Sequence, residues 1–198
     1  MVNDRGDRIL RLSVKEMVLV SMFAALTAVG AFIKIPIPYV PFTLQFLFVL
    51  FAGLLLDKRL AFLSQVIYLA LGLAGLPIFA QGGGPAYVLQ PTFGYLVGFA
   101  LGAYVIGAVV ERVREKGVPG YFLASMAGLV VVYVLGVIHL YIILNYVVQK
   151  PFTLAQAVWF GAIVCAPGDL FLSLVASLVG GRVYKTLQSV NPVHREVF

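Results

Sequence analysis

Long apolar runs separated by short charged clusters make up most of the chain. The longest uncharged run covers residues 60–110 and contains no Asp, Glu, Lys or Arg. A helix needs ~20 apolar residues to cross the ~30 Å hydrocarbon core of a membrane. The runs therefore predict an all-α integral membrane protein with six transmembrane helices, at residues 17–33, 41–56, 60–79, 93–110, 121–146 and 169–181.

The two ends of the chain add detail to this pattern. Residues 151–181 are too many for one plain span, and Pro167 interrupts them, so we expect a short helix from Thr153 before the sixth span. We take residues 1–16 and 186–198 as cytoplasmic segments flanking a transmembrane domain at 17–185. Because the first span has no A-x-A cleavage site after it, we interpret it as a retained anchor.

Basic residues gather on one side of the predicted membrane. Six spans place both ends of the domain on the same side, and only Lys34 and Lys150 of the 14 Lys and Arg residues lie opposite. Cytoplasmic loops are enriched in Lys and Arg, so the pattern predicts a multi-pass plasma-membrane protein with both termini in the cytoplasm. The residues on that side are Arg5, Arg8, Arg11, Lys15, Lys58, Arg59, Arg112, Arg114, Lys116, Arg182, Lys185 and Arg195.

Composition agrees with a membrane protein. Apolar residues make up 62% of the chain, charged residues 11%, and the mean hydropathy is +1.02. These values exclude an ordinary soluble domain. Membrane topology accounts for the net charge of +6, so we expect the lipid bilayer and no nucleic acid as a partner. The single cysteine, Cys165, is interpreted as a small buried apolar residue.

Three irregular segments fall on the outer side of the predicted membrane. They are KIPIPYVPFTLQ after the first span, a glycine-rich loop after the third, and CAPGD at the start of the sixth. Irregular backbone at membrane depth is tolerated only where protein or a water-filled cavity covers it. The segments therefore predict a pocket that opens outwards.

The glycine-rich loop contains Gly82, Gly83 and Gly84, followed by Pro85 and Tyr87. Glycine permits a positive φ, so a plain turn is one interpretation. Three glycines exceed what a tight turn requires, and they let backbone approach a ligand closely, which favours a binding loop. The loop lacks the lysine of a phosphate-binding P-loop, so we expect no ATP site in this chain.

Asp169 is the only acidic residue between Lys116 and Glu196. A carboxylate within a membrane segment is costly and indicates a functional site. The alternative is that Asp169 caps the last helix at its N-terminus. Both roles are compatible, because a capping carboxylate keeps an oxygen that accepts hydrogen bonds from ligand N–H groups.

Other polar residues in the spans have plainer interpretations. Gln45, beside Thr43, predicts either a ligand contact or a hydrogen bond between helices. His139 and Asn145 lie in the fifth span with no second ligand at a suitable spacing, so we expect no metal. No Ser-His-Asp or paired-carboxylate pattern occurs, so we expect neither an enzyme nor a cofactor.

Two further features concern surfaces. Tyr87 and Tyr95 are typical either of the aromatic belt at a membrane interface or of an aromatic pocket wall. Ala24 and Ala28 form a small-xxx-small face on the first span, which lets another helix approach closely, either within the bundle or from a partner.

Four motifs occur in order: PFTLQ at 41–45, GLPIFAQGGGP at 75–85, PTFGYLVGF at 91–99 and PGD at 167–169. Together they resemble the BioY family of biotin transporters, the substrate-capture S components of energy-coupling factor (ECF) transporters. The resemblance covers most of the chain, from the first span to the sixth. It implies six helices, an outward-facing biotin pocket, and a complex with a transmembrane coupling subunit and two cytoplasmic ATPase subunits.

The resemblance also implies roles for particular residues. Gln45, the glycines at 82–84, Tyr95 and Asp169 match the family's binding segments, with the glycine loop serving as part lid and part wall. We add Thr43 and Tyr87 to these substrate-binding residues because they lie beside them. The face over Ala24 and Ala28 is implied as the interface with the coupling subunit.

The chain departs from the family pattern at Leu172, where many members have lysine, and at Phe93, where many have glycine. Burying the unpaired carboxylate of biotin is costly. We therefore expect Lys34 to pair with it, helped by the N–H groups of residues 82–84 arranged as an anion nest, with the ring system near Asp169. Uptake of a related vitamin such as lipoate, and a stand-alone carrier without an ATPase, are the alternative interpretations.

Overall fold

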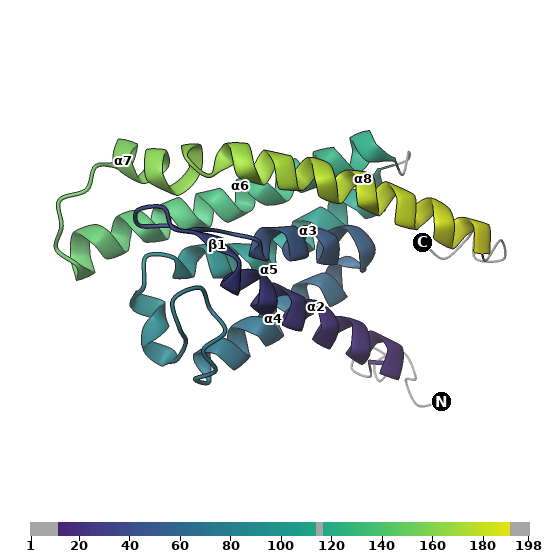
Figure 1. Cartoon of the computed structure of the whole chain (residues 1–198), viewed down its shortest axis with the longest axis horizontal. Helices are drawn as coiled ribbons and strands as arrows, with labels where there is room; N and C mark the ends of the chain where they lie inside the picture. Colours follow the sequence, from purple (N-terminus) through teal and green to yellow (C-terminus); the bar gives the residue numbers. More distant parts are fainter. Residues whose placement is uncertain (1–11, 114–116, 191–198) are drawn as a thin grey trace, which may run out of the picture.

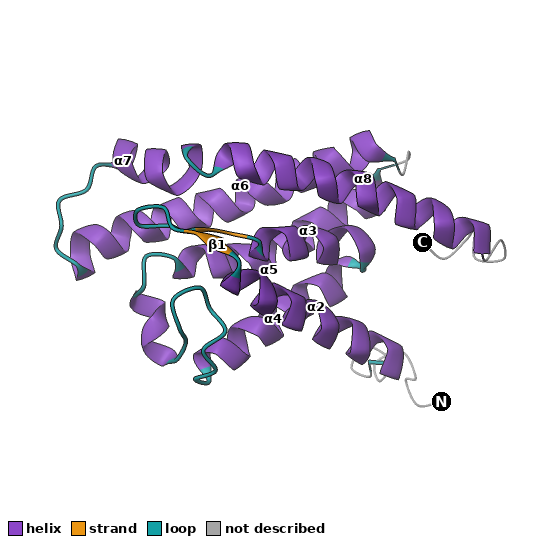
Figure 2. Ribbon diagram, viewed as in Figure 1, coloured by secondary structure: helices purple, strands orange, loops and turns teal. Residues whose placement is uncertain are grey.

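The computed structural model describes residues 12–113 and 117–190. The described chain is almost entirely helical, with one two-stranded hairpin (Figure 2), so the predicted all-α class is confirmed. The main helices are α2 (Val14–Phe32), α3 (Gln45–Leu55), α4 (Lys58–Leu73), α5 (Phe93–Arg112), α6 (Val118–Ile142), α7 (Leu154–Val158) and α8 (Ala166–Val190). Among the described residues, four stretches are long and apolar enough to cross a membrane: Val14–Phe32, Phe93–Arg112, Val118–Val147 and Leu154–Val183.

The elements form one elongated bundle (Figure 1). α5 lies against α3, α4 and α6, and α8 lies against α3 and α6. The hairpin, the glycine-rich loop and the α6–α7 connection lie toward the left, whereas the start of α2 and the end of α8 lie toward the right. Two of the three segments predicted to be irregular, the hairpin and the glycine-rich loop, therefore lie at one end of the bundle. The third, CAPGD, is mostly helical, because its residues 166–169 belong to α8. The expectations at Arg5, Arg8, Arg11, Arg114, Lys116 and Arg195 fall outside the described residues.

Short polar motifs in the sequence explain where several helices begin. Ser13 and Glu16 form a capping box at the start of α2, in which each side chain accepts a hydrogen bond from the other's backbone N–H. Thr153 and Gln156 form the same motif at the start of α7, which confirms the short helix predicted there. Helix starts with such caps can be read from the sequence because the contacts are local.

The predicted second span, at residues 41–56, is found as a helix that begins four residues later and ends at Leu55. Two short strands occupy its start and the preceding loop: β1 (Lys34–Ile35) pairs antiparallel with β2 (Phe42–Thr43). Only 11 residues remain for α3, which at 1.5 Å per residue gives about 16 Å, half of a membrane's hydrocarbon core. The hairpin itself is not buried, since β1 is exposed and β2 is half-buried.

The third span also ends earlier than predicted, at Leu73 rather than near residue 79. Gly75 has a φ of 113°. Its N–H bonds the carbonyl of Gly72 at 3.2 Å, and the N–H of Leu76 bonds the carbonyl of Leu71 at 3.2 Å. This is the Schellman arrangement that closes a helix C-terminus at a glycine.

The sixth span differs as well. α8 begins at Ala166 rather than near residue 169, because a proline fits the first turn of a helix, where its missing N–H has no partner to lose. A π-helical turn, η3 (Trp159–Ile163), joins it to α7. A second π-helical turn, η2 (Ile143–Val147), extends α6.

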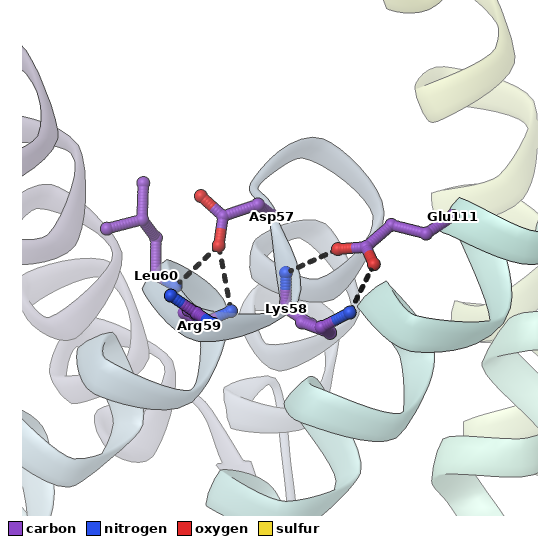
Figure 3. A network of polar contacts seen from close by, with 5 residues as sticks. All are labelled: Asp57, Lys58, Arg59, Leu60 and Glu111. Atoms are coloured by element: carbon purple, nitrogen blue, oxygen red, sulfur yellow. Dashed lines mark hydrogen bonds and ion pairs between the residues drawn. The ribbon is translucent and has the colours of Figure 1, made fainter. Parts of the chain in front are cut away.

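The turn between α3 and α4 is joined to the end of α5 by polar contacts (Figure 3). Oδ1 of Asp57 accepts hydrogen bonds from the N–H groups of Arg59 (2.8 Å) and Leu60 (3.1 Å), which caps α4. Nζ of Lys58 lies 2.6 Å from Oε2 of Glu111. Both side chains are partly exposed, so this ion pair orients the helix ends and contributes only ~0–1 kcal/mol.

Candidate ligand-binding site

A cavity of about 60 Å³ lies at the end of the bundle that carries the irregular segments. The hairpin, α3, the glycine-rich loop, α5, α6, η3 and α8 all contribute to its walls. Aromatic and aliphatic side chains, including Phe42, Phe46 and Phe99, cover most of the surface. Five of the predicted binding residues line it and are brought together from separate segments: Thr43, Gln45, Tyr87, Tyr95 and Asp169.

Asp169 has the only formally charged side chain among the described residues that line this cavity. It is 7% exposed, and its Oδ2 accepts a hydrogen bond of 2.6 Å from the hydroxyl of Tyr133 on α6. Asp169 lies in the first turn of α8, and its own N–H donates to the carbonyl of Cys165 at 3.1 Å. The N-cap interpretation is therefore wrong, and the contact with Tyr133 takes up one of the two carboxylate oxygens.

Gln45 faces the cavity from the first residue of α3 and is 3% exposed. Its Oε1 accepts a hydrogen bond from the hydroxyl of Thr43 at 3.1 Å. Its Nε2 donates to the hydroxyl of Tyr68 at 2.6 Å, and that hydroxyl donates to the carbonyl of Ile78 at 3.0 Å. The amide is therefore held by groups from the hairpin, from α4 and from the start of the glycine-rich loop.

Tyr95 forms a fixed part of the wall. Its hydroxyl donates to the carbonyl of Gly161 at 2.7 Å. A Cβ placed at Gly161 would collide with that hydroxyl, and one at Gly136 would collide with the ring. The two glycines thus create the space in which Tyr95 lies between α6 and η3, which favours the pocket wall over the interfacial belt for this residue.

Tyr87 closes another side of the cavity, from the short helix η1 (Pro85–Leu89). Its hydroxyl lies 3.1 Å from Oγ1 of Thr92, and its ring centroid lies 4.6 Å from that of Phe79. Burial raises the pKa of Tyr87 above its ordinary value. The phenol therefore remains neutral near pH 7 and can donate or accept a hydrogen bond.

The three glycines do not themselves line the cavity; Ala80 and Tyr87, on either side of them, do. Gly82 and Gly84 have φ angles of 121° and 99°, and their N–H groups donate to the carbonyls of Phe79 and Gly72, at 3.2 and 2.7 Å. An anion nest needs these N–H groups to point at a ligand. The nest expected over residues 82–84 is therefore wrong, because two of its donors serve to fold the loop.

Lys34 lies at the edge of the site rather than in it. Its Nζ donates to the carbonyl of Ala80 at 2.6 Å, which ties the hairpin to the glycine-rich loop. Ala80 lines the cavity and Lys34 does not. Nζ of Lys150 donates to the hydroxyl of Tyr39, in the loop between β1 and β2, at 2.8 Å. Pairing of Lys34 with a ligand carboxylate stays a prediction.

The small-residue face of α2 points into the bundle. Ala24 is 4% exposed and belongs to the hydrophobic core, and Ala28 packs against that core. Ala24 is therefore covered by the protein's own helices while Ala28 is half-buried, and the interface expected at these two residues stays a prediction. Ser21 and Ala25, another pair of small residues at this spacing, are exposed.

Sequence reasoning missed three residues that shape the site. Tyr133 and Cys165 line the cavity, and Tyr68 holds Gln45 from behind. A single tyrosine in an apolar run carries no signal of its own, so Tyr68 and Tyr133 were not recognisable. Cys165 is buried, as expected, and its place directly before the PGD motif was the one available hint.

His139 and Asn145, in contrast, have structural partners. The Nε2 atom of His139 lies 3.2 Å from the carbonyl of Gln90, and Asn145 donates to the carbonyls of Tyr141 and Phe152, both at 2.9 Å. Within residues 12–113 and 117–190, no group of three or more His, Cys, Asp or Glu side chains is placed to hold a metal ion.

An apolar helical bundle with a buried, aromatic-lined cavity and a single carboxylate defines a membrane protein that binds a small molecule. A model of the BioY family matches residues 4–189, and the chain belongs to this family.

Named relatives agree over nearly the whole length. A protein of Lysinibacillus sphaericus named as a probable biotin transporter BioY is 45% identical over 181 residues, covering 91% of this chain and 92% of its own. The biotin transporter BioY of Thermotoga maritima is 38% identical over 172 residues, covering 86% and 96%. Because these relatives are named as transporters, the expectation of a transport protein rather than an enzyme is confirmed.

A solved structure shares the fold. The S-component for biotin from an ECF-type ABC transporter, determined at 2.1 Å, superimposes with a TM-score of 0.75 at 25% sequence identity. The match covers 93% of this chain and 95% of that one. The predicted S-component-like bundle is therefore confirmed.

Proposed function

We propose that this protein captures biotin at the outer face of the plasma membrane and serves as the S component of an ATP-driven ECF transporter. Membership of the BioY family and the named relatives support the substrate. The observation that carries the proposal is that one carboxylate, Asp169, and one amide, Gln45, line the same largely apolar cavity.

The chemistry of biotin suits this pair. Its ureido ring has two N–H donors and one carbonyl acceptor. Oδ1 of Asp169 is available to accept from an N–H, while Nε2 of Gln45 has a second N–H to donate to the carbonyl. The thioether ring and the aliphatic chain then lie against apolar walls such as Phe46, Leu96 and Phe99, as is usual for small-molecule sites.

The acid tail of biotin needs a cation or water, since no Lys, Arg or His occurs among the described lining residues. We propose that the tail points outwards to the rim, where Nζ of Lys34 exchanges the carbonyl of Ala80 for the carboxylate. Leu172, on α8, is buried and does not line the cavity, so it supplies neither a charge nor a contact for the acid tail.

Binding requires the site to enlarge. Pockets for ligands of drug size measure ~300–1,000 Å³, and this cavity measures about 60 Å³. The hairpin loop is the segment we expect to move, because Val40, Pro41 and Phe42 line the cavity while the glycine-rich loop is anchored by backbone hydrogen bonds.

We propose that a transmembrane coupling subunit and two cytoplasmic ATPase subunits complete the transporter. The shared fold with a solved S-component of an ECF-type ABC transporter supports this assembly. The exposed face of α2 around Ser21 and Ala25 suits close approach of a partner helix. The excess of Lys and Arg at the ends of the domain supports cytoplasmic termini.

Calorimetric titration of the purified protein with biotin and with lipoate tests the substrate. Lipoate shares the acid tail and the sulfur-containing ring but lacks the ureido group. We expect biotin to bind far more tightly, and mass spectrometry of ligand released by denaturation to show biotin. Tighter binding of lipoate contradicts biotin as the substrate and leaves a vitamin transporter. Copurification with ATPase subunits separates the ECF complex from a stand-alone carrier.

A further inference from the structure

Tyr68 of α4 lies behind Gln45 and outside the cavity lining. It is 1% exposed, and its ring packs edge-on against Phe79, with centroids 5.3 Å apart. Its hydroxyl is bonded on two sides, accepting from Nε2 of Gln45 at 2.6 Å and donating to the carbonyl of Ile78 at 3.0 Å. The residue therefore connects the amide in the cavity to the backbone of the glycine-rich loop.

The single proton of the Tyr68 hydroxyl decides which way the Gln45 amide is oriented. A tyrosine hydroxyl has one proton, and a backbone carbonyl only accepts. Because Tyr68 gives its proton to Ile78, it can only accept from Gln45, so the amide nitrogen must face it. The reverse orientation would leave the carbonyl of Ile78 without this donor, which is unfavourable in a partly buried setting.

Thr43 does not determine the orientation of the Gln45 amide. Its hydroxyl donates to Oε1 of Gln45 at 3.1 Å, but a hydroxyl can equally accept from an amide nitrogen. A rotated amide would therefore keep a hydrogen bond to Thr43 and lose the one to Tyr68. Of the two neighbours, only Tyr68 distinguishes the nitrogen of Gln45 from its oxygen.

We infer that Tyr68 is a positioning residue that fixes which end of the Gln45 amide the ligand meets, and so sets the specificity of the site. This inference rests on the proposed function. The second N–H of Gln45 has no partner among the described residues and faces an acceptor on the ligand. With Asp169 as the acceptor, Gln45 and Asp169 together present one donor and one acceptor, which suits a neutral cyclic urea.

The probe is 2-iminobiotin, in which an imino group replaces the ureido carbonyl oxygen. At neutral pH it is protonated and offers a donor where biotin offers an acceptor. Calorimetry gives the discrimination ratio, the Kd for 2-iminobiotin divided by the Kd for biotin. Asp169 attracts the cation equally in the wild type and in Tyr68→Phe, so a change in the ratio reports the amide.

We expect Tyr68→Phe to lower the discrimination ratio by at least ~10-fold, because the released amide can rotate and present its oxygen to the imino group. The matched control is Ser125→Ala, which removes another fully buried hydroxyl bonded to a carbonyl but lies outside the cavity lining and does not contact Gln45. We expect its ratio to stay within ~3-fold of the wild type. Weaker binding of both ligands with an unchanged ratio in Tyr68→Phe would overturn the inference, as would an equal fall in the control.

Gln45→Glu provides a second test if Tyr68→Phe does not fold. Its carboxylate has the same shape and only accepts, so the ratio should fall by at least ~10-fold; an unchanged ratio would again overturn the inference. If the wild type binds biotin but the variants have the same discrimination ratio as the wild type, this inference alone is contradicted. A wild-type protein that binds no biotin contradicts the proposed function, and the role of Tyr68 with it.

Discussion

The hydroxyl of Tyr133 donates a hydrogen bond of 2.6 Å to Oδ2 of Asp169, joining α6 to the first turn of α8 inside the cavity. The bond occupies one carboxylate oxygen and restrains the orientation of the whole carboxylate group. Because burial of a carboxylate is costly without partners, this contact also explains how an acid is tolerated there. This is the geometry that the proposed contact between Asp169 and a ligand N–H requires.

We expect Asp169→Asn to weaken biotin binding by ~10- to 150-fold while the protein still folds. The amide keeps an oxygen that accepts from Tyr133 but loses a charge-assisted hydrogen bond, worth ~1.5–3 kcal/mol. Calorimetry on detergent-purified protein measures the change. Asp57→Asn is the matched control at the other end of the bundle (Figure 3), where asparagine also caps a helix well and affinity should not change. Unchanged affinity in Asp169→Asn contradicts a ligand contact.

Cys165 offers a direct reporter of occupancy, because it is the chain's single cysteine and lines the cavity. We expect saturating biotin to slow its labelling by a small methanethiosulfonate reagent by at least ~10-fold, since a bound ligand covers the thiol. Mass spectrometry follows the modified fraction, and denatured protein shows that the thiol reacts when released. Equal rates with and without biotin would place the ligand elsewhere.

The space around Tyr95 predicts a structural sensitivity. In Gly161→Ala, the new methyl group collides with the Tyr95 hydroxyl, so we expect ~1–3 kcal/mol of destabilisation and weaker biotin binding. Gly181→Ala is the control, since a Cβ there makes only ordinary contacts with Val118, at 3.4 Å or more, and alanine favours the helix. Thermal denaturation ranks the two variants. A Gly161→Ala protein as stable as the control means that Tyr95 is not confined as described.

Two small-residue pairs of α2, Ser21 with Ala25 and Ala24 with Ala28, make opposite predictions. The double change of Ser21 and Ala25 to leucine should leave biotin binding intact and greatly reduce uptake by cells, because bulk blocks the approach of a partner helix. Ala24→Leu should instead destabilise the protein, by ~1–3 kcal/mol, since Ala24 is buried. Radiolabelled uptake and thermal stability together separate the faces. Full uptake in the Ser21 and Ala25 variant rules out this docking surface.

Lys34→Ala tests the position of the acid tail. We expect the wild type to bind biotin at least ~10-fold more tightly than biotin amide, in which the acid tail is neutral. The variant should lose this preference because it lacks the lysine charge. Lys150→Ala removes the other basic side chain on this side, which contacts Tyr39, and should keep the preference. Equal binding of acid and amide by the wild type indicates a carboxylate that is simply hydrated at the rim.

The sequence by itself determined the features that depend on local chemistry. Apolar runs separated by charges located most of the helices, the Ser13 and Thr153 motifs located two helix starts, and the lone acid in a membrane segment singled out Asp169. Each of these signals acts over a few residues, so no knowledge of distant contacts was needed. The start of α3 could not be predicted in the same way. Residues 42–43 are as apolar as the helix that follows, and only their pairing with residues 34–35 shows that they form a strand.

Only the tertiary structure decided which face of each helix meets protein and which meets lipid. Hydropathy cannot tell these apart, since a protein core and a lipid tail are both apolar. For this reason Ala24 was expected at an interface and lies inside the bundle, while Tyr68 and Tyr133 passed as ordinary residues of apolar spans. Folding brings their hydroxyls within hydrogen-bonding distance of Gln45 and Asp169, which lie on other helices.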